Sequence, residues 1–167
     1  MLLFCLRPDH DRLAETTYAS ITHALPLISE QYRELLFQPL YQTGIDYSFG
    51  NLHTVKGNEP VLPVLHGNRN DPFLNYDEDL MEAITPDAKA ALEALQAAIS
   101  SVHQSVKLDT GDLLCIDNRR TVHGRSSFTP RYDGFDRWLQ RSFVVRDLGK
   151  SAVDRNPGER VIRTAFS

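Results

Sequence analysis

Residues 117–125, DNRRTVHGR, and residues 134–141, GFDRWLQR, decide the fold of this chain. The apolar run just before them, residues 112–117, follows a turn signal and predicts a buried β-strand. His123 lies just beyond the end of that strand. From 137 to 145 apolar and polar residues alternate, which predicts a second strand with Arg137 and Arg141 on one face. One histidine and two arginines placed in this way indicate a site for a metal and a carboxylate.

The face that carries the two arginines is otherwise apolar. Burying a guanidinium among apolar side chains is costly unless an anion accompanies it. We therefore expect Arg137 and Arg141 to hold anionic groups across one cavity. The alternative is that both arginines form ion pairs with nearby aspartates, namely Asp133, Asp136 and Asp147.

These stretches resemble the C-terminal signature of the clavaminate synthase-like, TauD-related oxygenases. Members of this family depend on iron(II) and 2-oxoglutarate, and some hydroxylate free asparagine or arginine. The similarity also covers residues 2–7 (LLFCLR), 15–17 (ETT) and 71–77 (DPFLNYD). It implies an α+β fold: a mainly antiparallel sheet with flanking helices, forming part of a double-stranded β-helix, or jelly-roll, core.

The resemblance also implies a role for particular residues. His123 is expected to be an iron ligand. Arg137 is expected to bind the far carboxylate of 2-oxoglutarate, and Thr17 to contact 2-oxoglutarate through its hydroxyl. Asp77 and Arg141 are expected to contact an amino-acid substrate. Thr16 is the alternative to its neighbour Thr17. The expected cofactors are therefore Fe(II) and, as co-substrate, 2-oxoglutarate.

One element of the family pattern is missing from this sequence. Such enzymes hold iron by two histidines and a carboxylate, and the first two ligands come as His-x-Asp or His-x-Glu. None of the six histidines here is followed two residues later by an acid. In the family that motif lies shortly before the segment matching residues 2–7. We therefore expect residues 1–167 to form a single domain, the C-terminal portion of an oxygenase without this motif, with weak or absent iron binding.

Three functional hypotheses follow. The first is an Fe(II)/2-oxoglutarate-dependent dioxygenase that hydroxylates a free amino acid or a related small molecule, with little activity expected from this chain alone. The second is a non-catalytic remnant that binds a carboxylate ligand or a partner protein. The third is single-stranded nucleic-acid binding by the arginine-rich residues 119–146, against which the net charge of −4 argues.

Composition limits the remaining possibilities. A hydrophobic content of 41% and a mean hydropathy of −0.34 indicate a soluble globular protein. No signal segment or membrane span is apparent, so we expect a cytoplasmic protein. The apolar run 2–6 looks like an interior strand, and self-association through an exposed sheet edge is expected. Cys5 and Cys115 both lie in apolar runs, which predicts buried free thiols.

Helix signals mark two further segments. Thr85 followed by Pro86 is a helix start, because threonine caps a first turn and proline fits its first position. Beyond it, an apolar stripe at helical spacing predicts a helix packed on a sheet; its residues are Leu92, Leu95, Ile99 and Val102. Ser29 is expected to cap a second helix that continues to about Phe37.

Overall fold

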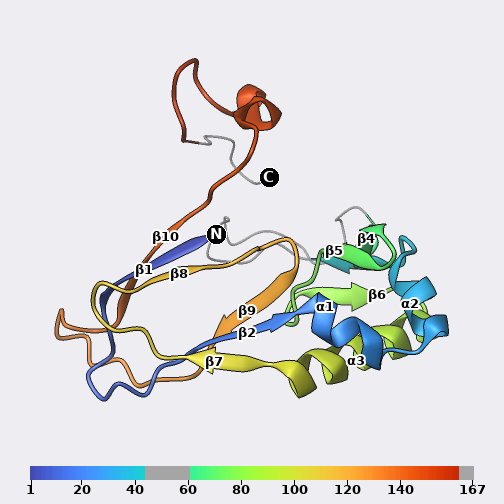
Figure 1. Cartoon of the computed structure of the whole chain (residues 1–167), viewed down its shortest axis with the longest axis horizontal. Coiled ribbons are helices and arrows are strands. Elements are labelled where there is room, and N and C mark those ends of the chain that lie inside the picture. Colours follow the sequence, from blue (N-terminus) through green and yellow to red (C-terminus); the bar gives the residue numbers. More distant parts are fainter. Residues whose placement is uncertain (44–60, 162–167) are drawn as a thin grey trace.

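The computed structural model describes residues 1–43 and 61–161. Within them every paired strand runs antiparallel, and helices pack beside the sheets (Figure 1). The strands are β1 (Leu2–Arg7), β2 (Thr16–Ser20), β3 (Tyr41–Thr43), β4 (Leu65–Asn68), β5 (Asp71–Leu74), β6 (Met81–Ala83), β7 (Gln104–Val106), β8 (Leu113–Cys115), β9 (Thr121–Arg125) and β10 (Trp138–Ser142). The helices are α1 (Ile21–Ala24), α2 (Glu30–Leu36) and α3 (Pro86–Val102), with 3-10 segments η1 (Leu25–Leu27) and η2 (Leu148–Asp154). The predicted α+β class is confirmed.

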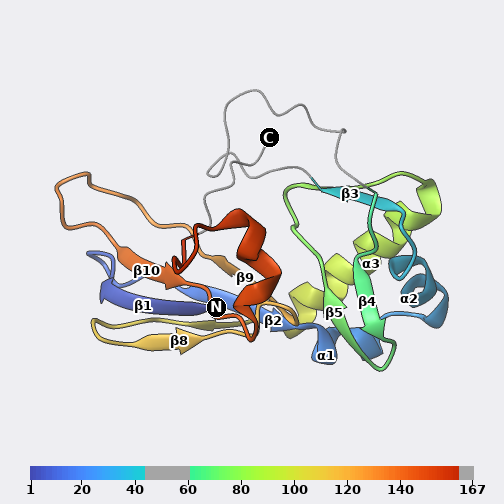
Figure 2. The same cartoon turned by 90° about the horizontal axis from the view of Figure 1, so that it is seen from above.

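Two three-stranded sheets form one end of the molecule. Their strand orders are β10-β1-β8 and β7-β2-β9, and they lie one above the other in Figure 1. The pairs β3–β6 and β4–β5 lie at the other end, together with the helices, as the view from above in Figure 2 shows. As predicted, β1 is an interior strand with a partner on each side. Self-association through a sheet edge remains a prediction and would involve β8 or β10.

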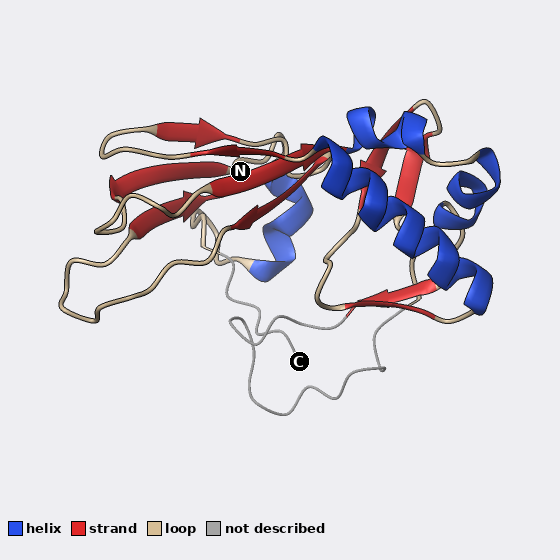
Figure 3. Cartoon of the chain, turned by 90° about the horizontal axis from the view of Figure 1, so that it is seen from below, coloured by secondary structure: helices blue, strands red, loops and turns tan. Residues whose placement is uncertain are grey.

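Helix α3 forms the main core with the strands beside it (Figure 3). It begins where the sequence predicts, because the Thr85 hydroxyl accepts a hydrogen bond from the Ala88 N–H at 3.2 Å. Leu95 and Ile99 are buried, and the other two residues of the predicted stripe are half-buried against the same cluster. Among the residues that the structure places, no helix combines the length and the apolar character needed to cross a bilayer.

The second predicted helix is α2. Ser29 caps it, because its hydroxyl accepts a hydrogen bond from the Tyr32 N–H at 3.4 Å. The helix ends at Leu36, and Phe37 is its C-cap, so the predicted end is confirmed. Leu36 is fully buried in the same core cluster as Leu95, which fixes α2 against α3.

The strands near the signature residues are bounded differently from the predictions. His123 lies inside β9 and not beyond the end of a strand, because Thr121–Arg125 pair with β2 along their whole length. The strand expected from 137 to 145 is only β10, and the apolar side chains of 143–145 are exposed. Alternation alone therefore overestimates this strand, since its pairing with β1 ends at the pair Leu2–Ser142.

The prediction of buried cysteines is correct for Cys5 and wrong for Cys115. β8 is an outer strand, and its residues 113 and 115 share a face with Leu2 and Phe4 of β1. Leu113 on that face is 55% exposed, so the expectation of a fully buried strand is also wrong. Cys5 points to the opposite face of the sheet, which separates the two thiols, and both are free.

Leu95 offers a test of this core. Its side chain is 0% exposed, so Leu95→Ala should lower the free energy of unfolding by about 2–5 kcal/mol through lost burial and a residual cavity. Urea denaturation followed by circular dichroism would measure this. Glu93→Ala, on the exposed side of the same helix, is the matched control and should change stability little. Equal effects of the two substitutions would contradict the packing of α3 described here.

Candidate functional site

His123 belongs to the face of β9 that is turned away from α3. In the β2–β9 pair Tyr18 lies opposite His123, and Thr16 lies opposite Arg125. Directly opposed residues of an antiparallel pair share a face. Val122 and its partner in β2 point the other way and pack on the α3 core. His123, Thr16 and Arg125 therefore lie together on the face of this sheet that is turned away from α3.

Arg137 reaches this same face from the other sheet. It lies just before β10, and its Nη2 donates a hydrogen bond to Thr16 Oγ1 at 3.0 Å. Thr16 is only 2% exposed, so the contact is well shielded from water. The imidazole and the guanidinium that the sequence singled out thus lie on one side of β2–β9.

The alternative explanation of Arg137, an ion pair with a neighbouring aspartate, finds no support in the part of the chain that the structure describes. Asp133 contacts His10, and the carboxylate of Asp136 accepts main-chain N–H groups. Asp147 accepts the N–H of Gly149. No described carboxylate lies within ion-pair distance of Arg137. A half-buried guanidinium with only a hydroxyl contact is suited to receive an anionic ligand.

The charges around Arg137 also favour the binding of an anionic ligand. Burial and the positive charge of Arg125 lower its pKa, and the opposing influences of Cys5 and Asp9 do not cancel this. Burial raises the pKa of the Cys5 thiol, which keeps it neutral. Two guanidinium groups therefore concentrate positive charge beside Thr16, and a carboxylate placed there would relieve their repulsion.

Thr16 and Thr17 are placed differently. Thr17 points to the opposite face of β2 from Thr16, where its Oγ1 would lie 3.1 Å from a Cβ added at Gly124. This close approach explains why glycine follows His123. Thr17 lines the cleft described next, whereas Thr16 is the hydroxyl that contacts Arg137.

A cleft of about 940 Å³ opens beside β9. Four of the five predicted site residues line it: His123, Thr17, Asp77 and Arg141. The fifth, Arg137, does not line the cleft. It contacts Thr16 of β2, and the next residue of that strand, Thr17, lines the cleft. Acidic side chains at 77–79 line part of the cleft, and Arg125 and Arg141 line another part. A cleft with both signs of charge is suited to a zwitterion such as a free amino acid.

Asp77 lies in a turn that is tied to the strand of His123. Its Oδ1 accepts the N–H groups of Asp79 at 3.1 Å and of Leu80 at 3.2 Å. Just upstream, the Leu74 N–H donates to the Arg119 carbonyl at 2.8 Å, which joins β5 to the turn before β9. The acidic part of the cleft is thereby held in register with β9.

A bidentate ion pair strengthens this connection. Arg120 donates from Nε and Nη2 to the two carboxylate oxygens of Asp71, at 2.9 and 2.7 Å. The guanidinium of Arg120 is the main cause that lowers the pKa of Asp71. Arg119 and Arg120 also lie over the ring of Phe73, at 3.5 and 4.3 Å from its centroid. The β4–β5 pair and the turn before β9 therefore form one connected unit.

The imidazole of His123 is suited to metal binding. Burial lowers its pKa, and the positive charges of Arg141 and the N-terminal amine act in the same direction, against a main-chain hydrogen bond involving Thr121. A lowered pKa leaves the ring neutral near pH 7, and the neutral form is the one that binds a metal.

The described residues do not complete an iron site around His123. Among them, the only group of three potential ligands with mutually close donor atoms is His10, Asp133 and Asp136, which does not include His123. A facial triad needs two histidines and a carboxylate on one metal. The residues placed here supply one of these ligands, so they do not fit a complete iron centre by themselves.

Comparison with known proteins now identifies the family. Residues 1–143 match the family described as "Taurine catabolism dioxygenase TauD, TfdA family". The chain belongs to this family. L-asparagine oxygenase of Streptomyces coelicolor is 42% identical over 156 residues, which are 93% of this chain and 46% of that protein. Clavaminate synthase 2 of Streptomyces clavuligerus is 41% identical over 147 residues, 88% of this chain and 45% of that protein.

Solved structures of TauD-related oxygenases share the fold. Asparagine oxygenase in complex with Fe(II), 2S,3S-3-hydroxyasparagine and succinate has a TM-score of 0.86 at 42% identity, covering 94% of this chain and 48% of that one. The non-heme iron oxygenase OrfP with Fe, succinate and (3R,4R)-dihydroxy-L-Arg has a TM-score of 0.82 at 33% identity, covering 96% and 52%. The predicted family and partial jelly-roll fold are confirmed. This chain spans about half the length of these relatives.

Two residues of the site were missed by the sequence analysis. Arg125 lies on the same face of β9 as His123. Strand alternation would have shown this if residues 121–125 had been predicted as a strand. Tyr76 lines the cleft, and burial, with the nearby acidic side chains, raises its pKa to about 12, so it stays a neutral phenol. Nothing in the sequence separates Tyr76 from other tyrosines, because its burial arises from distant segments.

The state of His123 can be measured. We expect its imidazole, followed by NMR in the metal-free chain, to titrate below the ordinary histidine range, because burial and Arg141 disfavour the charged form. Arg141→Gln should raise that pKa by removing one positive charge. His123→Gln assigns the signal by eliminating it. An unchanged pKa in Arg141→Gln would show that the arginine does not act on this imidazole.

Proposed function

We propose that this site serves the iron(II)- and 2-oxoglutarate-dependent hydroxylation of a free amino acid. Residues 1–167 would form one domain of such an oxygenase, binding 2-oxoglutarate and the amino acid and supplying one iron ligand. The observation that carries the proposal is the half-buried guanidinium of Arg137, held by Thr16 on the same face as His123. Membership of the TauD family supports it, as does the succinate held by asparagine oxygenase and OrfP in their crystals.

The far carboxylate of 2-oxoglutarate is assigned to Arg137 and a β2 threonine. A guanidinium presents several N–H donors in a fixed fork, and one of them already contacts Thr16. A carboxylate can accept from the remaining donors and from the hydroxyl. Of the two adjacent threonines this contact favours Thr16, while Thr17 would act from the opposite face of the strand.

The amino-acid substrate is assigned to the cleft between Asp77 and Arg141. A carboxylate can receive the ammonium group or a cationic side chain, and a guanidinium can receive the α-carboxylate. Relatives of this chain carry names that specify asparagine, lysine and arginine. Asn75, also in the cleft wall, offers an amide that suits a neutral side chain better than a guanidinium.

Bound iron, in this family, provides the oxidising chemistry. This chain contributes the neutral imidazole of His123 as a ligand, and the other two ligands are not found among the described residues. The part that these residues play is thus to bind and orient the two organic reactants.

A second candidate function is a non-catalytic domain that binds a carboxylate ligand. The incomplete set of iron ligands among the described residues favours it, because Arg137 and Thr16 can bind a carboxylate without metal. Hydroxylation requires iron bound at His123, whereas simple carboxylate binding does not. Succinate formation by the chain would therefore exclude the non-catalytic function, whereas carboxylate binding is expected of both.

Binding of 2-oxoglutarate to the metal-free chain tests the carboxylate site. By isothermal titration calorimetry, Arg137→Ala should weaken binding by at least about tenfold, since a charge-assisted hydrogen bond is lost. Thr16→Ala should weaken it by about five- to tenfold, and Thr17→Ala should have a smaller effect. If Thr17→Ala has the larger effect instead, the assignment to Thr16 is wrong.

Turnover tests the iron-dependent function. With iron(II), O2, 2-oxoglutarate and free asparagine, arginine or lysine, we expect the purified 167-residue chain to form no more succinate than His123→Ala does. One imidazole cannot complete the metal site. Succinate formation that exceeds the His123→Ala background would show that the chain contains a complete iron site and would exclude the non-catalytic alternative.

A further inference from the structure

Two loops meet at the end of the sheets where Arg137 and Thr16 lie. The first, residues 8–15, joins β1 to β2 and leads into Thr16. The second, residues 126–137, joins β9 to β10 and ends at Arg137. Glu15 and Ser126 hold the bases of the two loops together, because the Glu15 N–H donates to the Ser126 hydroxyl at 2.8 Å and the Ser126 N–H donates to the Glu15 carbonyl at 3.0 Å.

Each loop is shaped by one aspartate. Asp9, which is 6% exposed, accepts the N–H groups of Leu13 at 2.9 Å and Ala14 at 3.0 Å. Asp136 accepts the N–H groups of Arg131 at 2.8 Å and Tyr132 at 2.7 Å. These bonds enclose one non-glycine residue with positive φ in each loop, Arg12 at 52° and Tyr132 at 55°. Such backbone is unfavourable for residues with a Cβ, so the aspartates are needed to hold it.

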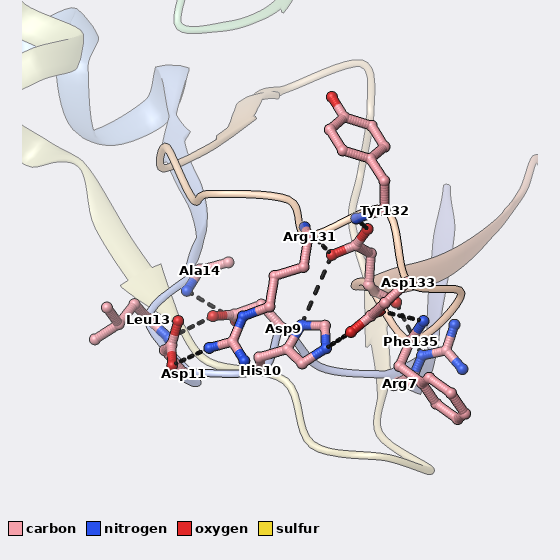
Figure 4. Close-up of polar contacts among 11 residues, drawn as sticks. Arg7, Asp9, His10, Asp11, Leu13, Ala14, Arg131, Tyr132, Asp133 and Phe135 are labelled. Atoms are coloured by element: carbon pink, nitrogen blue, oxygen red, sulfur yellow. Dashed lines mark hydrogen bonds and ion pairs between the residues drawn. The ribbon is translucent and has the colours of Figure 1, made fainter.

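His10 connects the two loops (Figure 4). Its Nε2 lies 3.0 Å from Asp133 Oδ2, and its Nδ1 lies 3.7 Å from Asp136 Oδ1. An ionised carboxylate can only accept, so the imidazole donates to Asp133. A second connection runs from Arg131 Nη2 to Asp11 Oδ1 at 2.8 Å. The carboxylates flank different ring nitrogens and already accept main-chain N–H groups, which suits a hydrogen-bonded connection between loops better than a metal site.

Arg7 acts directly on the peptide that precedes Arg137. Its Nε donates to the Asp136 carbonyl at 2.9 Å, and its guanidinium lies 5.4 Å from the centroid of the Phe135 ring. The Asp136 carbonyl belongs to the peptide group that links Asp136 to Arg137. Fixing this peptide plane fixes the N and Cα atoms of Arg137, the point at which its side chain leaves the backbone.

We infer that His10, Asp136 and Arg7 are positioning residues that hold Arg137 against Thr16 and thereby set the affinity for 2-oxoglutarate. We call these three residues and their contacts the loop clamp. The inference rests on the proposed function, because it assumes that Arg137 binds the co-substrate. None of the three residues needs to touch 2-oxoglutarate; they act through the position of one guanidinium, and binding is sensitive to small displacements of such a group.

Binding of 2-oxoglutarate to the full 167-residue chain, measured by calorimetry, tests the loop clamp. We expect His10→Ala and Arg7→Lys each to weaken binding by about tenfold. Lysine keeps the positive charge at position 7 but has no Nε–H at the place from which arginine donates. His23→Ala, which removes an exposed histidine of α1, should bind as the wild type does. Wild-type affinity in His10→Ala would overturn the inference.

A double-mutant cycle separates positioning from a general loss of structure. In an Arg137→Lys background the guanidinium that the loop clamp orients is already absent. His10→Ala should therefore cause little further loss of affinity for 2-oxoglutarate. If the two losses add, His10 acts independently of Arg137 and the inference fails. Emission of Trp138, the single tryptophan and the residue after Arg137, should also shift in ligand-free His10→Ala but not in His23→Ala.

Failure of the inference can be told from failure of the proposed function. If the wild-type chain binds 2-oxoglutarate and Arg137→Ala loses this binding, the co-substrate assignment stands. An unaffected His10→Ala, or additive losses in the double-mutant cycle, then overturns the loop clamp alone. If the wild-type chain does not bind 2-oxoglutarate, or Arg137→Ala binds it unchanged, the co-substrate assignment itself is wrong and the inference falls with it.

Discussion

A hydrogen bond from Arg137 to Thr16 joins the two three-stranded sheets on the face that carries His123. The rest of the site depends on it, because it places a half-buried positive charge beside a buried hydroxyl, on the same face of β2–β9 as the imidazole. A guanidinium in such surroundings is unfavourable alone and favourable with a carboxylate. The fold thus holds a cationic group in a position that an anionic reactant would stabilise.

The surrounding charges are arranged around this contact. Arg125 adds positive charge next to Arg137, and Arg141 lowers the pKa of His123 together with burial. Acidic side chains lie at the β5–β6 turn, where Asp77 accepts two main-chain N–H groups. Others lie at the loop ends, where Asp133 contacts His10 and Asp136 accepts main-chain N–H groups. Under the proposed function, acidic and basic groups on different parts of the cleft would orient a zwitterionic amino acid.

Membership of the TauD family and about half coverage of its relatives fit this distribution of roles. Under the proposed function, the described residues supply the groups that bind the organic reactants and one imidazole for the metal. Its main core, built on α3, extends from the Val122 face of the β2–β9 pair toward the end that carries β3–β6 and β4–β5 (Figure 3). The site is therefore supported from one side by a packed helix and from the other by polar contacts between loops, which determine how closely Arg137 is positioned.

The sequence by itself determined the α+β class, both helix starts, the interior position of β1 and the family. The family and the fold class came from the resemblance of several segments to known oxygenases. The helix starts follow from local chemistry, because Thr85 and Ser29 cap helices through their own hydroxyls, and apolar spacing selects the buried face of α3. It also selected Arg137 and His123, because both belong to a signature with fixed spacing.

Only the tertiary structure decided which residues meet. It placed Thr16 instead of Thr17 against Arg137, exposed Cys115 on an outer strand, and put His123 inside β9. It also brought His10 to Asp133, 123 positions away in the sequence. The physical reason is that strand pairing and register depend on partners far along the chain, and a shift of one residue exchanges the two faces of a strand.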